Sequence, residues 1–569
     1  MNLIPKHLQV ILGILSCFIL GITNASGQQW IGISSQSPAQ TSIKTTGNIN
    51  SLTQVIIDIP GFSFLEKSYL GRNSRILQLP GGQPVLEAGS PDLERYSFTL
   101  QIPADGNVEA SIISESHTDY TDIDVIPSEG NIFRNQGRNT LQKGASYTSD
   151  AFYPGKLVDA DQPFIVRNTR AQSYHVYPLQ YNPVTRTLRF YHHLSVELVY
   201  SLGSGINPLN AIDLNISPIE GINTGATAIG TTALKAGTLP AGKGSMLIIC
   251  PEKFRDAILP LAEWRIQTGI QTEIINSEQF TDCQQVYDFI KEYYGSHPNL
   301  AYLLLVGDSR YIPPYMFHDG ASDNYYSYLS GNDHYPDILV GRISAENVKD
   351  VEIQVERTLQ YETAPGSDAS WITKVTGIGS TLSPGDDGES DFQHIRNLLK
   401  TIKSVTPKTT YEFLDGSQGE SDAPGDPVTT DITDRINEGT GIVFYTGHGS
   451  PDRLATGMLT NSAASGLENN GRCPIVWAVA CEAGNFVEKY CNAEAWLRAT
   501  NGNGQPTGAV AAIMSSGPQT SSPPMEAQDK IAEILSNPQE SLSTVGAVSI
   551  KGMMSMNDKY GEVGDFFRD

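Results

Sequence analysis

The chain has 569 residues, of which 39% are apolar and 18% are charged, and its formal net charge is −24. A chain of this length needs more than one hydrophobic core, so we expect two to four domains. The excess of 62 acidic over 38 basic residues disfavours nucleic acid and anionic membrane surfaces as partners.

The N-terminus has the pattern of a secretory signal peptide. Lys6 precedes an apolar run over residues 10–22, and small residues follow around Ala25. The run is shorter than the roughly 20 residues that a membrane span needs. We therefore predict a signal peptide over residues 1–27, a secreted or cell-surface protein and no membrane span.

Five cysteines remain after residue 27, and an odd number in a secreted protein leaves at least one thiol unpaired. No CxxC pair occurs, and the cysteines are widely spaced, so neither a disulfide scaffold nor a zinc site is favoured. HExxH is also absent, which disfavours zinc catalysis. A free thiol outside the cell is either buried and inert or chemically employed.

Residues 28–202 have the pattern of an all-β domain, because short alternating or β-branched runs are separated by Asn, Gly and Pro. A Gly-, Ala- and Thr-rich linker follows over 203–243, a composition that invites proteolysis. The strands that we expect cover residues 53–59, 96–102, 110–113, 164–166, 188–191 and 196–200.

From residue 244 the pattern changes to alternating strands and helices, which predicts mostly parallel, doubly wound sheets in two subdomains, 244–370 and 371–569. In the first we expect strands over 246–250, 271–275 and 302–306, with helices over 252–268 and 284–294. In the second we expect strands over 375–378, 410–413, 442–445, 475–480 and 509–514, with helices over 392–404, 431–438, 492–500 and 526–535.

Two of the apolar strands end in reactive residues: His448 comes just past one, and Cys481 stands at the last position of the next. In open α/β sheets ligands bind beyond the carboxyl ends of the strands, so both side chains should face one crevice. A partly wet thiol beside an imidazole is activated as a nucleophile. Glycines 447, 449 and 484 let the backbone approach a substrate and aim N–H groups at an oxyanion.

At these residues the sequence resembles the gingipain family of cysteine peptidases, which share a caspase-like sheet. The resemblance implies an α/β caspase-like catalytic domain of two doubly wound sheet subdomains, preceded by an all-β prodomain. The matching stretches, in order, are LLLVGD at 303–308, GNDHYPD at 331–337, DDGESDFQH at 386–394, YTGHGS at 445–450, VAC at 479–481, AEAWLRA at 493–499 and PTGAVAAI at 506–513.

The resemblance implies that Cys481 attacks the scissile carbonyl and that His448 protonates the leaving amine. It also implies that the amides of Gly449 and Cys481 hold the oxyanion, without a cofactor for the chemistry. Glu482, directly after the nucleophile, replaces an apolar family residue, and its charge should raise the cysteine pKa.

Asp391 matches the acidic floor of the primary specificity pocket in the arginine-specific members, and Met525 matches a residue that lines this pocket. A carboxylate there suits the guanidinium of arginine. The other reading of Asp391 is an N-cap of the helix that follows. Ser521 stands where the arginine-specific members have tryptophan, so one wall of the pocket is either missing or rebuilt.

The acid that orients the histidine in the family would fall on Ser380, so this chain lacks it at that position. Asp386 or Asp387 could substitute, or the dyad could act without an acid. Asp333 and Asp337 match a family calcium site, and oxygen ligands at close spacing suit calcium. The other reading of these two residues is a hydrogen-bonded turn without an ion.

The region before the linker resembles the family prodomain through YPGKLVDADQPFIVRNTRAQ at 153–172. Arg134 matches the arginine that blocks the specificity pocket before activation, so the prodomain should inhibit its own enzyme; the other reading is a solvated loop arginine. The activation cleavage would fall near Lys235, by another protease or by an enzyme that tolerates lysine.

We therefore expect a secreted cysteine endopeptidase precursor that cuts protein and peptide substrates after a basic residue, with arginine favoured. A secretion-associated signal peptidase of the same family remains open, as does a catalytically silent surface or adhesion homologue. In the family a final strand, an immunoglobulin-like domain and a secretion tail follow the point where residue 569 ends this sequence, which we interpret as truncated. That tail would make secretion machinery a partner.

Overall fold

The computed structural model describes residues 28–219 and 243–561, except residues 49, 139, 318–319, 364–368, 406–407, 488–489, 538–541 and 543. The predicted signal peptide over 1–27, the predicted cleavage at Lys235 and the chain end from residue 562 lie outside the described residues. Among the described residues, no helix is both long enough and apolar enough to cross a membrane.

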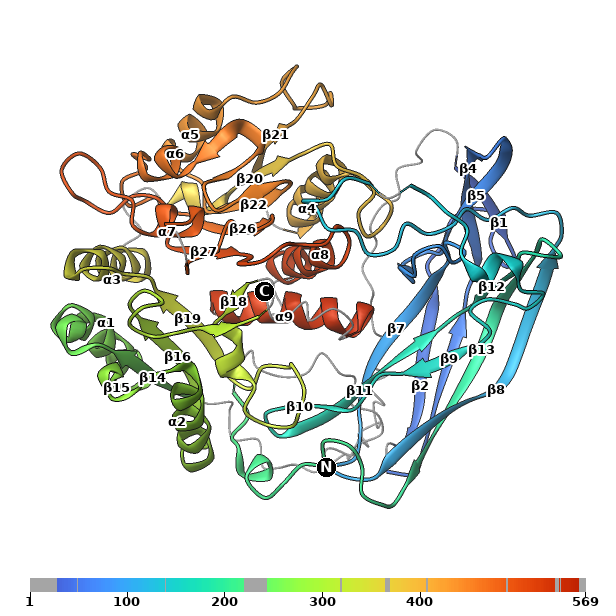
Figure 1. The fold of residues 1–569 in the computed structure, drawn as a ribbon, viewed down its shortest axis with the longest axis horizontal. Coiled ribbons are helices and arrows are strands. Elements are labelled where there is room, and N and C mark those ends of the chain that lie inside the picture. Colours follow the sequence, from blue (N-terminus) through green and yellow to red (C-terminus); the bar gives the residue numbers. More distant parts are fainter. Residues whose placement is uncertain are drawn as a thin grey trace, which may run out of the picture.

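The region before residue 220 consists of antiparallel sheets around one core (Figure 1). Side chains on β3 alternate between buried and exposed positions, so one face of the strand, with Val55 and Ile57, enters the core. The sheets run in the orders β12-β13-β3-β2, β10-β11-β7-β6 and β1-β4-β5, while β8 pairs with β13 and β9 with β11. The strands are β1 Gln29–Gly32, β2 Ser42–Asn48, β3 Leu52–Asp58, β4 Gly61–Tyr69, β5 Arg72–Gln78, β6 Gln83–Pro84, β7 Glu94–Gln101, β8 Asn107–Tyr120, β9 Val158–Ala160, β10 Phe164–Val166, β11 Thr169–Val176, β12 Leu179–Asn182 and β13 Thr187–Ser201.

The next region contains a parallel sheet in the order β15-β14-β16-β19. Its central strands are almost continuously apolar, as expected for strands that are covered on both faces. The elements are β14 Ser245–Cys250, α1 Arg255–Gln267, β15 Gln271–Asn276, α2 Cys283–Ser296, β16 Leu300–Val306, β17 Tyr315–Met316, β18 Ala321–Ser322, β19 Leu339–Ile343 and α3 Val348–Thr363.

The third region contains a parallel sheet in the order β21-β20-β22-β26-β27. The strand order reverses between β20 and β22, and the crevice at such a point is where doubly wound sheets bind ligands. The elements are β20 Lys374–Gly379, α4 Asp391–Val405, β21 Thr409–Leu414, α5 Thr429–Asn437, β22 Ile442–Thr446, β23 Gly449–Ser450, β24 Arg453–Leu454, β25 Leu459–Thr460, α6 Asn461–Ser465, β26 Ile475–Val479, α7 Asn492–Leu497, β27 Ala511–Met514, α8 Pro523–Ser536 and α9 Val545–Tyr560.

Helix α9 connects the three regions, and the sequence did not predict it. It packs beside α8 and contacts β19 and β7 (Figure 1). Ser549 on α9 accepts a hydrogen bond from the indole of Trp477 on β26. The N-terminal β region also reaches the third sheet near Arg134, so it covers the carboxyl ends of the strands in that sheet.

Candidate functional site

The third sheet places His448 and Cys481 side by side at its carboxyl edge. Strands β22 and β26 are parallel neighbours, with Thr446 opposite Val479, so His448 and Cys481 each lie two residues past the end of a strand. The amide of Gly447 donates to the carbonyl of Val479 over 3.1 Å. This bond extends the pairing of β22 with β26 by one residue, toward His448 and Cys481. Cys481 is therefore beyond the strand rather than at its last position.

Gly449 lies directly against the backbone of Cys481. A Cβ at position 449 would come within 2.8 Å of both the carbonyl oxygen of Cys481 and the Cβ of Ala480. Only glycine permits this approach, which brings the 449 segment next to the cysteine.

The backbone of His448 is fixed while its side chain stays exposed. Its carbonyl accepts the hydroxyl of Tyr445 over 2.6 Å and the amide of Ala455 over 3.0 Å. The oxygen of the same tyrosine accepts the amide of Thr456. These bonds hold the segment that carries the imidazole without occupying the ring.

The thiol of Cys481 is covered in this form of the protein, with 1% of the residue exposed. Burial raises the pKa of the thiol, whereas the N–H groups of Gln519 and Asn135 and the charge of Arg134 oppose this, and Glu482 adds to it. The amide of Gln519 lies 3.3 Å from Sγ. The expected partly wet thiol is therefore wrong for this form, because residues 134 and 135 lie over it.

Arg134 enters a closed pocket whose floor is Asp391. Its Nη1 donates to both carboxylate oxygens of Asp391 at 2.9 Å, and each residue is only 1% exposed. Its Nη2 donates to the carbonyl of Ser521 over 3.0 Å, and its Nε to the carbonyl of Thr520 over 3.2 Å. Two backbone carbonyls thus accept hydrogen bonds from the guanidinium. They are available whichever side chain stands at position 521.

The segment that carries Arg134 runs antiparallel to residues 519–521 as a short extended strand. Phe133 forms a β-bridge with Thr520. The amide of Arg134 donates to the carbonyl of Gln519 over 2.7 Å, and the carbonyl of Ile132 accepts from Ser521 over 2.8 Å. An extended peptide that adds to an exposed edge in this way is a common mode of peptide recognition.

Ser380 and Met525 support the pocket from behind. The hydroxyl of Ser380 donates to Oδ2 of Asp391 over 2.5 Å, and its amide donates to the carbonyl of Thr446 over 3.0 Å. Met525 is fully buried and packs on Gly385, where a Cβ would come within 2.4 Å of its terminal methyl. Both residues therefore act on the loop that leads into Asp391.

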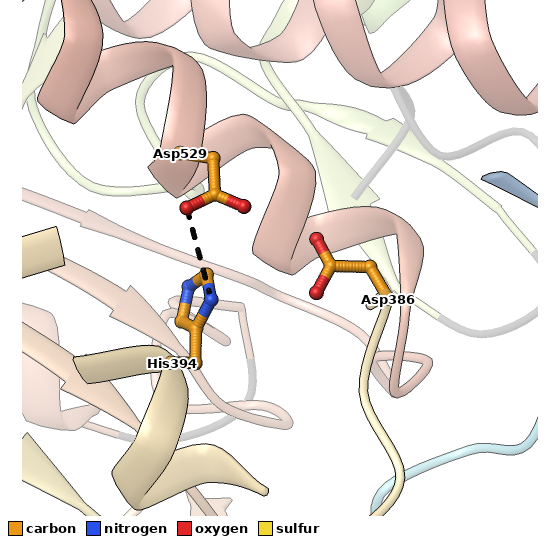
Figure 2. A group of neighbouring side chains, drawn as sticks. All are labelled: Asp386, His394 and Asp529. Atoms are coloured by element: carbon orange, nitrogen blue, oxygen red, sulfur yellow. Dashed lines mark ion pairs between the residues drawn. The ribbon is translucent and has the colours of Figure 1, made fainter. Parts of the chain in front are cut away.

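Asp386 does not lie beside His448 but faces His394 and Asp529 (Figure 2). Asp529 Oδ1 is 3.9 Å from Nδ1 of the completely buried His394. Nδ1 also lies 2.7 Å from Oε1 of Glu389, and Nε2 lies 3.1 Å from Oε1 of Gln528. These acceptors on both ring nitrogens fix the protonation state of His394.

The amide of Gln528 cannot be turned around, because its nitrogen donates to the carbonyls of Tyr445 and Trp477. Both nitrogens of His394 must therefore donate, so the ring is an imidazolium. Burial opposes this charge, but Asp529, Glu389 and Asp386 outweigh it and raise the pKa of His394 to about 10. A doubly protonated ring has no lone pair for a metal, so this group does not fit a metal ion.

The carboxylate oxygens of Asp333 and Asp337 are bonded by amide groups. The carboxylate of Asp337 accepts the amides of Arg167, Leu329 and Ser330. The carboxylate of Asp333 accepts the amides of Ile165 and Tyr335 and the side-chain amide of Asn207. Calcium binds through oxygen lone pairs, so the ion would compete with these amide groups for the two carboxylates in the precursor. Calcium binding by the protein without its N-terminal region stays a prediction.

Asp415, which the sequence analysis missed, lies at the end of β21 on the same edge of the sheet. Its Oδ2 accepts the hydroxyl of Thr456 over 2.8 Å. Burial raises its pKa, and the charge of His448 lowers it. The only signal in the sequence is its position directly after an apolar strand.

The comparisons identify both halves of the chain. The model of peptidase family C25 matches residues 240–566, and that of the C25 propeptide matches residues 43–207. Gingipain R2 of Porphyromonas gingivalis is 31% identical over 86% of this chain and 67% of its own length. Gingipain R1 of the same organism is 30% identical over 91% of this chain, which spans about half (52%) of that relative.

Two solved structures have the same fold. That of the Arg-specific cysteine proteinase gingipain R (RgpB) is 32% identical, with a TM-score of 0.54 over 57% of this chain and 75% of its own. That of a complex of the pro- and mature domains of RgpB is 31% identical, with a TM-score of 0.53 over 57% of this chain and 77% of its own. The chain therefore belongs to peptidase family C25, the gingipain family of cysteine endopeptidases, and carries the propeptide of that family ahead of its peptidase region.

Proposed function

We propose that this protein is the precursor of an endopeptidase that cleaves after arginine, with Cys481 as nucleophile and His448 as acid and base. The observation that carries the proposal is Arg134, which fills the Asp391 pocket and brings the following residue, Asn135, next to the thiol. The pocket suits arginine better than lysine, because three guanidinium nitrogens find acceptors there.

The proposed reaction begins when the thiol proton passes to His448 and Sγ attacks the carbonyl carbon of the arginine. The amides of Gly449 and Cys481 stabilise the oxyanion. The C–N bond then breaks as His448 gives its proton to the amine, which leaves a thioester on Cys481. Water, deprotonated by His448, hydrolyses the thioester and regenerates the thiol.

We propose that the propeptide region is the inhibitor of the precursor. It places Arg134 in the pocket and covers Cys481, so substrate cannot enter until this segment leaves. A cut at Lys235 would then require another protease, because the pocket suits a guanidinium. Export is proposed from the signal pattern at the N-terminus, and N-terminal sequencing of the protein from culture medium tests it.

Peptide substrates with Arg, Lys, Gly or Ser before the reporter group test the proposal after activation of the chain. We expect cleavage after Arg to exceed cleavage after Lys by at least tenfold, and Cys481→Ala to abolish both. An active site that takes no label from an arginine chloromethyl ketone and cleaves no peptide would show a silent homologue. Cleavage after Gly or Ser instead would indicate the signal peptidase.

A further inference from the structure

A cavity of about 140 Å³ lies between the third sheet and helices α8 and α9, next to the proposed active site. Most of its wall is apolar, and no charged side chain of the described residues lines it. The wall includes Trp477, Val479, Ile513, Ala527, Met553 and Met556.

The propeptide region contributes Asn131 and Phe133 to the wall, but neither Ile132 nor Arg134. This alternation is expected of an extended segment, in which every second side chain faces the same way. Arg134 points to Asp391. The cavity lies on the opposite side of the extended segment, the side that Phe133 faces. Thr520, which bridges to Phe133, also lines it.

We propose that this cavity binds the side chain of the substrate residue that precedes the arginine, and that the enzyme selects an aromatic or long apolar residue there. The inference rests on the proposed cleavage after arginine. Phe133 occupies the same position in the inhibitory segment and remains half-buried at the wall. The volume suits the guest, since an apolar protein cavity of about 150 Å³ binds benzene.

The wall can adapt to more than one apolar guest because Met514, Met553 and Met556 line it. Methionine is flexible and makes favourable contacts with aromatic rings. No charged side chain of the described residues lines the wall. Binding of an Asp or Lys side chain in the cavity is therefore unfavourable, because its buried charge would have no partner.

The test uses the full chain, activated by a serine protease that is then inhibited. The probes are fluorogenic peptides Ala-X-Arg, with Gly, Asp, Leu or Phe at X. We expect kcat/KM for Phe to exceed that for Gly by tenfold or more, and Asp to fall below Gly. Equal rates for Phe and Gly would overturn the inference and leave arginine cleavage intact, whereas no cleavage of any peptide would reject the proposed function.

Ala527→Leu narrows the cavity, and the exposed Ala423→Leu is its matched control. We expect the first variant to reduce the Phe-to-Gly ratio below threefold and the control to leave it unchanged. If Ala527→Leu leaves the Phe-to-Gly ratio of kcat/KM unchanged, the substrate side chain binds elsewhere.

A second measurement does not depend on the fold of a helix variant. In the unprocessed chain, Phe133→Ala should speed labelling of Cys481 by a peptide chloromethyl ketone at least fivefold more than Ile132→Ala. Equal effects of the two substitutions would contradict the cavity as a side-chain site.

Discussion

The hydroxyl of Ser380 donates a 2.5 Å hydrogen bond to Oδ2 of Asp391, the carboxylate that holds the guanidinium of Arg134. The family resemblance leads one to expect an acid at position 380. In this chain the serine instead donates a hydrogen bond to the carboxylate of Asp391. Ser380 therefore serves the pocket and not the histidine.

Ser380→Ala should weaken arginine binding more than it slows the reaction. A hydrogen bond to a charged group contributes about 1.5–3 kcal/mol, so KM for an arginine peptide should rise by roughly tenfold or more. We expect kcat to change by less than threefold. Steady-state kinetics measure both, with Ser404→Ala on the exposed end of α4 as control. An unchanged KM would contradict this role.

Arg134→Ala should release the inhibition of the precursor. Removing one partner of a buried ion pair costs about 3–5 kcal/mol, so labelling of Cys481 in the unprocessed chain should speed up on the order of a hundredfold. Arg134→Lys should be intermediate, because an ammonium reaches Asp391 without serving both carbonyls. The control is Arg138→Ala, which removes a half-exposed arginine of the same region that pairs with Glu129 instead of Asp391. Equal labelling of both variants would be evidence against the blocking role.

Most strands of the two parallel sheets were predicted, and the central ones, such as β14 and β16, are nearly continuous apolar runs bounded by loops. The edge strand β19 was missed, because Gly341 and Arg342 interrupt its apolar run. The strand β13 was predicted as two strands, over 188–191 and 196–200. His192 and His193 interrupt the apolar pattern between them, and the pairing with β8 shifts in register at this place. The helix α9 was missed because Gly546 and Gly552 and its β-branched residues lower its intrinsic helix propensity.

The position of Cys481 beside His448 could be predicted, since neighbouring parallel strands end at the same edge. The burial of the thiol could not, because it depends on Asn135, which lies more than three hundred residues earlier in the sequence. The carbonyls of Thr520 and Ser521 were also beyond prediction, since backbone groups leave no trace in the residue type. The sequence therefore predicted which side chains form the site. Only the contacts between segments far apart in the chain show which groups cover or bond them.

The charge of His394 should make the stability of the precursor depend on pH. A base with a raised pKa contributes stability that is complete below its ordinary pKa of 6.5 and is lost as the pH rises toward about 10. We therefore expect the Tm of the wild type to fall between pH 7 and pH 10. His394→Gln should lower the Tm by roughly 5–10 °C at pH 6 and flatten this dependence. The exposed His117→Gln is the control, and a parallel pH dependence of both variants would contradict the assignment.

Metal removal should leave the precursor unchanged. The ring of His394 has no lone pair for a metal, and the oxygens of Asp333 and Asp337 already accept amide groups. EDTA and added calcium should each shift the Tm of the unprocessed chain by less than about 1 °C, although a bound ion at a hundred times its Kd would add about 2.7 kcal/mol. A clear drop in Tm with EDTA that calcium reverses would show a bound ion.

Asp415 should act as the positioning acid for His448, in place of the residue that Ser380 replaces. Its hydrogen bond from Thr456 holds it on the segment whose backbone also fixes His448, through Ala455 and Tyr445. Asp415→Asn keeps the shape and removes the charge that favours the imidazolium. The charge of His448 attracts that of Asp415, and the variant removes this attraction from the acid and base of the reaction. We expect kcat to drop roughly tenfold or more, with KM nearly unchanged.

The neighbouring Asp426→Asn, on the exposed loop, serves as the control, because it removes a charge near Asp415 without a bond to the histidine segment. A kcat that stays unchanged, or that falls equally in the control, would show that His448 works without a carboxylate from β21.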